Sequence, residues 1–120
     1  MAQTVLDGDL VIQQLAQLGR DLDAAIKRLG ALEEVAVDTE GEYRVSFSRI
    51  FRNAQGSVED RKQAAIAETD QEWRLWGKAV AAVRLQRESL KALHARIDIG
   101  RTMASRDKAL VSLSGRTGET

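Results

Sequence analysis

Apolar residues recur at alternating steps of four and three along the first half of the chain. This spacing places them on one narrow stripe of an α-helix, which is typical of coiled coils, whereas globular helices carry a broader apolar face. The stripe continues from Val11 to Ile50 and predicts one helix over residues 9–54. Its members are Val11, Leu15, Leu18, Leu22, Ala25, Leu29, Leu32, Ala36, Thr39, Tyr43, Phe47 and Ile50.

Residues 37–41 are the weak point of this predicted helix. The stretch is poor in helix-forming residues, and a glycine such as Gly41 costs about 1 kcal/mol relative to alanine inside a helix. A kink at this point is one alternative. Because the apolar spacing continues through the weak stretch, we expect a single helix instead.

The clearest turn signal lies between residues 53 and 60. Gly56 suits the left-handed conformation that follows a helix end. Ser57 and Asp60 have the spacing of a capping box, with aspartate where glutamate or glutamine is usual. We therefore predict a turn near residues 53–58 within one helical-hairpin domain over residues 9–113. The composition of residues 1–8 predicts a frayed N-terminus, and that of residues 114–120 predicts a disordered tail.

The second predicted helix begins at Val58 and continues to at least Met103. It carries two neighbouring apolar rows, and the first helix can cover only one of them. The second row therefore requires another chain, so the predicted fold is all-α: a long antiparallel helical hairpin, or coiled coil, assembling into a helical-bundle oligomer. The residues predicted for the oligomer interface are Trp73, Trp76, Val80, Val83, Leu90 and Ile97.

The predicted seam of this helix, the row that faces the first helix, begins Ile66, Thr69, Trp73, Trp76, Val80 and Val83 and continues through Arg87, Leu90, His94 and Ile97. A neighbouring row contains Leu75, Ala79, Ala82 and Leu93. If the turn centres near residue 56, Trp73 faces Thr39 and Trp76 faces Ala36, which pairs large side chains with small ones. Either tryptophan could instead bind a partner if its ring is exposed.

Two polar residues fall on the predicted seam. Arg87 should pair with Asp21 or Asp23 on the first helix and fix the register. His94 is the only histidine, and Asp98 follows four residues later. We expect His94 to form an interhelical hydrogen bond, with a pH-sensitive contact as the alternative, because a catalytic or metal site needs companions.

Composition narrows the possible functions. The 120 residues contain no proline and no cysteine, which favours uninterrupted helices and excludes disulfides and thiolate metal sites. The N-terminus lacks the pattern of a signal peptide, and no apolar run approaches the roughly 20 residues that span a bilayer. We therefore expect a soluble cytoplasmic protein. Because the sequence carries no catalytic, metal or phosphate-binding motif, we also expect no enzymatic activity, no cofactor and no small-molecule substrate.

Charge is divided unevenly between the two halves. Residues 1–42 contain nine acidic and three basic side chains, a net charge of −6, and the remaining residues carry +6. The two halves can attract each other within or between subunits. Alternatively, the basic half contacts nucleic acid. The candidate nucleic-acid-binding residues lie around the turn and are Arg44, Arg49, Arg52, Arg61 and Lys62.

The stretch from Tyr43 to Met103 resembles a group of small helical-hairpin proteins. The resemblance rests on the arginine-rich end of the first helix, the turn Gln55-Gly56-Ser57-Val58-Glu59-Asp60-Arg61-Lys62 and the Ala/Arg/Leu-rich helix that follows. Temperate phages and prophages encode these proteins, often near genes for recombination and single-strand annealing. The resemblance implies a phage protein in the bacterial host cytoplasm. It carries over no functional residue, and the pair Trp73 and Trp76 departs from the pattern.

The leading functional hypothesis is a non-enzymatic, oligomeric adaptor that acts through protein–protein contacts, with a nucleic-acid-processing or recombination assembly as its setting. One alternative is direct nucleic-acid binding by the basic turn region. The other is a structural phage protein, or one that inhibits a host factor. None of the three functions requires a membrane.

Overall fold

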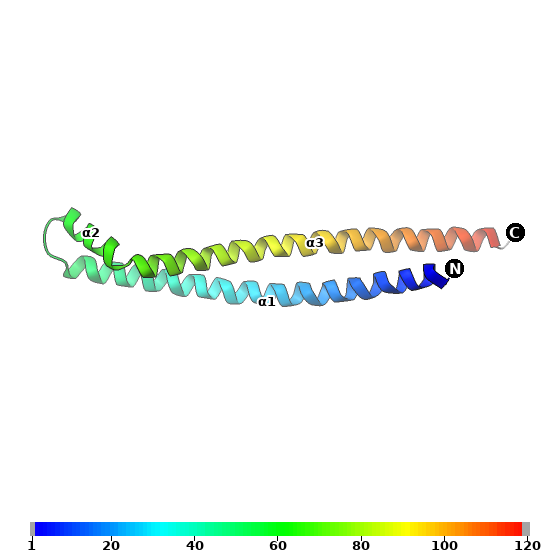
Figure 1. Cartoon of the computed structure of the whole chain (residues 1–120), viewed down its shortest axis with the longest axis horizontal. Helices are drawn as coiled ribbons and strands as arrows, with labels where there is room; N and C mark the ends of the chain where they lie inside the picture. Colours follow the sequence, from blue (N-terminus) through cyan, green and yellow to red (C-terminus); the bar gives the residue numbers. More distant parts are fainter. Residues whose placement is uncertain (1, 119–120) are drawn as a thin grey trace. The chain divides into compact units, whose positions relative to one another are not determined.

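The computed structural model describes the backbone of residues 2–118 and the side chains of residues 8–115, and these residues contain three helices and no strand. Helix α1 spans Ala2–Asn53, α2 spans Val58–Glu68 and α3 spans Asp70–Gly118 (Figure 1). The all-α prediction is confirmed, and α1 continues through residues 37–41 without a break. Helix also covers residues 2–8 and 114–118, where a frayed end and a disordered tail were predicted. Met1, Glu119 and Thr120 lie outside the described residues.

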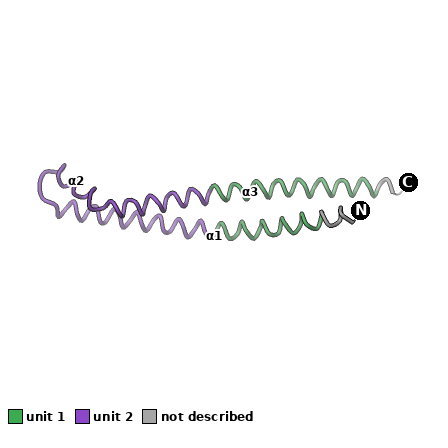
Figure 2. The backbone as a smooth tube through the Cα atoms, in the orientation of Figure 1, with its two compact units in different colours: residues 1–26, 88–120 green, residues 27–87 purple. Residues whose placement is uncertain are grey.

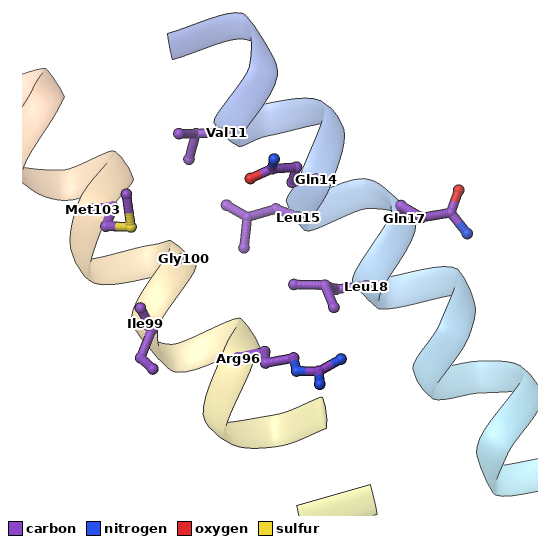
Figure 3. Close-up of a pocket in the computed structure, with 9 residues that line it drawn as sticks. All are labelled: Val11, Gln14, Leu15, Gln17, Leu18, Arg96, Ile99, Gly100 and Met103. Atoms are coloured by element: carbon purple, nitrogen blue, oxygen red, sulfur yellow. The ribbon is translucent and has the colours of Figure 1, made fainter. Parts of the chain in front are cut away.

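The chain forms two compact units (Figure 2). Unit 2, residues 27–87, is a helical hairpin made by the second half of α1, by α2 and by the start of α3. Unit 1 contains residues 1–26 and 88–120, and within it the first half of α1 lies antiparallel to the rest of α3 (Figure 3).

The connection between α1 and α2 has the geometry that its residues predict. Gly56 has a φ of 109°, a conformation that glycine adopts without the strain of a side chain. The Ser57 hydroxyl accepts a hydrogen bond from the Asp60 backbone N–H at 3.1 Å. The Asp60 carboxylate accepts one in return from the Ser57 N–H at 3.2 Å. This capping box satisfies two backbone donors and fixes the start of α2.

A bend at Thr69 separates α2 from α3, so the prediction of one helix from Val58 to Met103 is wrong. Thr69 has φ −105° and ψ 15°. Its hydroxyl donates to the Ala65 carbonyl at 2.6 Å, and its backbone N–H donates to the same oxygen at 3.1 Å. Threonine hydroxyls that bond the carbonyl four residues earlier bend helices. The bend also lets a threonine that is only 1% exposed satisfy its hydroxyl within its own helix.

The row of α3 that faces α1 in unit 2 differs from the predicted seam. Ile66, Trp73, Val80 and Arg87 were expected on the seam, yet all four are exposed. In the less exposed row, Ala65, Glu72, Ala79 and Gln86 take the places expected for these four residues, each one position earlier in the sequence. The members of this row in unit 2 are Ala65 of α2, Thr69 at the bend, and Glu72, Trp76, Ala79, Val83 and Gln86 of α3.

The predicted pairing of residues across the hairpin is also wrong. Trp76 stacks on Tyr43, with ring centroids 5.6 Å apart, although it was expected opposite Ala36. Arg87 lies 3.4 Å from the Glu33 carboxylate, although Asp21 and Asp23 were its expected partners. Two observations explain the shift. The bend at Thr69 interrupts the straight helix that the predicted register assumed. The small residues Ala65 of α2 and Ala79 of α3 are buried in place of the larger Ile66 and Val80.

The buried core is small. Among the described side chains only five are buried, namely Ala65, Thr69, Ala79, Val83 and Ile97. Many large apolar side chains of the described residues are instead in contact with solvent, among them Trp73, Leu85 and Val111.

Gly100 marks a close approach between helices in unit 1. A Cβ atom built on Gly100 would lie 2.7 Å from Cδ2 of Leu15, whereas one built on Gly41 would meet no atom within 4 Å.

Replacing Gly41 by alanine should raise the free energy of unfolding by about 1 kcal/mol, because alanine is the better helix former. Gly100→Ala should give a smaller gain or none, because the Leu15 side chain must shift to admit the new methyl group. Urea unfolding monitored by circular dichroism measures both, and an equal gain at both positions would contradict the close packing.

Candidate protein-interaction surface

The five cations predicted to bind nucleic acid do not form one free cluster. The Arg44 guanidinium forms an ion pair with Glu40 at 2.6 Å. Arg52 donates a hydrogen bond to the Ser48 hydroxyl at 3.1 Å. Both partners lie four residues earlier on α1, so these two arginines are partly engaged with side chains of their own helix.

Arg61 has a structural role at the end of α1. Its Nε donates to the Phe51 carbonyl at 2.9 Å, and its guanidinium carbon lies 4.7 Å from the centroid of the Phe51 ring. The carbonyls of the last helical turn lack partners inside the helix, and a cation there also opposes the negative end of the helix dipole. Arg61 therefore joins the start of α2 to the end of α1.

Arg49 and Lys62 remain exposed, and no hydrogen bond or ion pair engages them among the described side chains. Of the five candidates, these two are thus the most available to a phosphate group. Two free cations make a much smaller electrostatic footprint than five, since each neutralised phosphate contributes separately to affinity.

Four of the six residues predicted for an oligomer interface lie inside the chain. Val83 and Ile97 are buried, Leu90 is half-buried, and Trp76 stacks on Tyr43. These side chains are covered by α1, so they are less available to another molecule.

The remaining two predicted interface residues, Trp73 and Val80, point outward and belong to an exposed row. Ile66, Trp73 and Val80 are 46%, 54% and 37% exposed and are spaced seven residues apart. The same spacing reaches Glu59 before them and Arg87 after them. Glu59 and Ile66 belong to α2 and the other three residues to α3, so the bend at Thr69 falls between Ile66 and Trp73. We call these five residues, Glu59, Ile66, Trp73, Val80 and Arg87, the outer strip. All of them belong to unit 2.

Arg87 at one end of the outer strip is only weakly engaged. Its distance to Glu33 is 3.4 Å, and the two side chains are 61% and 48% exposed. Exposed pairs of this kind contribute about 0–1 kcal/mol. At the other end, the Glu59 carboxylate accepts a hydrogen bond from Gln63 at 3.0 Å. Both charges thus remain accessible to a partner molecule.

A shallow groove in unit 1 was not predicted from the sequence. Its volume is about 380 Å³, and it is lined by Leu15 and Leu18 of α1 and by Gly100 and Met103 of α3, among others (Figure 3). Arg96 and two glutamines, Gln14 and Gln17, supply the polar groups of its lining.

Other features relevant to chemistry are few within residues 8–115. His94 is exposed. This part of the chain contains no group of three or more His, Cys, Asp or Glu side chains able to hold a metal ion. The Glu72 Oε2 atom is buried without a hydrogen-bond partner, next to the outer strip in sequence. None of the described helices combines the length and the apolar character needed to cross a membrane.

Comparisons of the chain with protein-family models, with curated proteins and with solved structures find no match. The resemblance to temperate-phage hairpin proteins therefore stays a prediction from the sequence. Arguments about function rest on the surface of this chain alone.

The role of Arg61 can be tested against its neighbour. Arg61→Ala should lower the free energy of unfolding by about 1–2 kcal/mol, because it removes a part-buried hydrogen bond and a cation–π contact. Lys62→Ala should change it by less than about 0.5 kcal/mol, as is usual for an exposed side chain. Urea unfolding of both variants measures the difference, and equal effects would show that Arg61 does not hold the hairpin.

Proposed function

We propose that the protein is a non-enzymatic, self-associating helical adaptor that acts through protein–protein contacts. The observation that carries the proposal is the outer strip, whose three apolar side chains remain exposed at heptad spacing. The cytoplasm of a bacterial host and a nucleic-acid-processing or recombination assembly remain the proposed setting, on the sequence resemblance alone.

The exposed surface supports association rather than a stable free monomer. The three apolar members of the outer strip are between 37% and 54% exposed. A standard protein interface buries about 800 Å² on each partner. Full burial of one large aliphatic side chain contributes about 1.5–3 kcal/mol, so covering the outer strip would stabilise the hairpin substantially.

Trp73 is the natural anchor of such an interface. Tryptophan is enriched among the few residues that carry most of the binding energy, and these residues cluster at interface centres. Trp73 lies at the middle of the outer strip, between Ile66 and Val80. Trp76 cannot serve equally, because its ring is stacked on Tyr43.

The substitution Trp73→Glu should therefore reduce the association state. Light scattering during size exclusion should give a multimeric mass for the unmodified chain and a mass near 13.2 kDa for the variant. Leu85→Glu is the matched control, because Leu85 is 70% exposed on the same helix but lies outside the outer strip. This control should keep the multimeric mass.

Two results would contradict the proposal. One is a Trp73→Glu variant with the same mass as the unmodified chain. The other is an unmodified chain that stays monomeric alone but gains mass, in a salt-dependent way, only when an oligonucleotide is added. The second result would favour direct nucleic-acid binding, which Arg49→Ala combined with Lys62→Ala should then weaken.

A further inference from the structure

We infer that a second copy of this chain covers the outer strip, running antiparallel to the first, with a two-fold axis at Trp73. The inference rests on the proposed self-association and adds its partner, its orientation and its register. It follows from the order of chemical types along the strip.

The outer strip is complementary to its own reverse. Reading from Glu59 to Arg87, it runs acid, aliphatic, aromatic, aliphatic, base, at steps of seven residues. Two copies laid antiparallel about Trp73 place Ile66 of one chain opposite Val80 of the other, and the two Trp73 rings meet at the centre. Glu59 of each chain then lies opposite Arg87 of the other.

Charge selects this arrangement over the alternatives. A parallel pairing would set Arg87 against Arg87 and Glu59 against Glu59, and like charges directly opposite each other are destabilising. An antiparallel pairing centred between Trp73 and Val80 would place Trp73 opposite Val80, and Arg87 opposite the aliphatic Ile66. Only the pairing about Trp73 keeps all three apolar members together and matches both charges.

A two-fold interface requires a self-complementary patch, because the same surface is contributed by both subunits. The end charges of the outer strip meet this requirement. Charged positions beside an apolar stripe commonly set partner choice and orientation in helical assemblies. A membrane surface fits less well, since amphipathic helices that bind lipid carry mainly basic residues beside their apolar face.

The end charges are free to make these contacts. The pair between Arg87 and Glu33 is long and largely exposed, so Arg87 can turn toward a partner at little cost. Glu59 is exposed in the first turn of α2 and keeps one carboxylate oxygen besides the one that accepts from Gln63. Each dimer would contain two such contacts, one at either end of the strip.

Cysteine cross-linking tests the register, since the natural chain has no cysteine. Ile66→Cys and Val80→Cys variants, one carrying an affinity tag, are mixed and oxidised gently. We expect the mixed disulfide between the two variants to form at least about five-fold faster than either variant links to itself. Leu85→Cys, which lies off the strip, is the control for collisions and should link slowly with every partner.

Charge reversal tests the orientation independently. Glu59→Arg and Arg87→Glu should each raise the dimer dissociation constant about five- to ten-fold, because two exposed ion pairs are lost per dimer. The double variant should restore it to within about three-fold of the unmodified chain, since the pairs re-form with reversed sign. Arg87→Glu makes the contact with Glu33 repulsive in the single variant and in the double variant alike. Rescue by the double variant therefore reports the contact between chains and not the pair with Glu33. Lys78→Glu, which is exposed on α3 five residues from Trp73 and therefore on another face of the helix, is the control and should leave the dissociation constant unchanged.

The outcomes distinguish the two proposals. Preferential mixed cross-links together with rescue by the double variant support the antiparallel dimer about Trp73. Faster self-linking of Ile66→Cys or Val80→Cys, or absence of rescue, overturns this arrangement. If Trp73→Glu still dissociates the protein in that case, self-association stands and only the register is wrong. Circular dichroism of each variant confirms that a lost contact does not reflect lost helix.

Discussion

This structure depends on one constraint: two paired helices bury only a small part of each other's surface. Each helix buries one narrow stripe against its neighbour, and every apolar side chain outside that stripe needs another partner or faces water. In this chain the stripe buries little, because Ala65 and Ala79 occupy it beside Trp76. The larger side chains Trp73 and Val80 fall outside it. The location of the exposed apolar surface is therefore a direct consequence of which row of α3 faces α1.

Local contacts between polar and small groups decide that row. Thr69 bends the chain between α2 and α3 by bonding its hydroxyl to the Ala65 carbonyl. Arg61 holds the start of α2 against the end of α1 through the Phe51 carbonyl and ring. In unit 1, Gly100 leaves the space that Leu15 enters. These contacts are individually modest, and each fixes which side chains meet between the helices of its own unit.

Features set by neighbouring residues were predictable from the sequence, and those set by contacts across the hairpin were not. The helical class, the turn and the capping box of Ser57 with Asp60 depend on short-range spacing, and the structure has them where the sequence placed them.

The seam of α3 was misplaced because the helix offers two adjacent apolar rows, and periodicity alone does not rank them. The small residues Ala65 and Ala79 on one of these rows were the signal that this row packs closely against α1. The bend at Thr69 was missed because a threonine inside a helical pattern carries no distinctive local signature. The cations of the turn were grouped by sequence proximity, whereas Arg61 is engaged with Phe51.

The central claim is that the apolar members of the outer strip are covered by another copy of the chain. Sedimentation equilibrium of the unmodified protein over a wide range of concentrations tests it most directly. The account predicts a reversible shift from the chain mass of 13.2 kDa at the lowest concentrations to twice that mass at higher ones. A single species of 13.2 kDa at every concentration, with helical content unchanged, would contradict it.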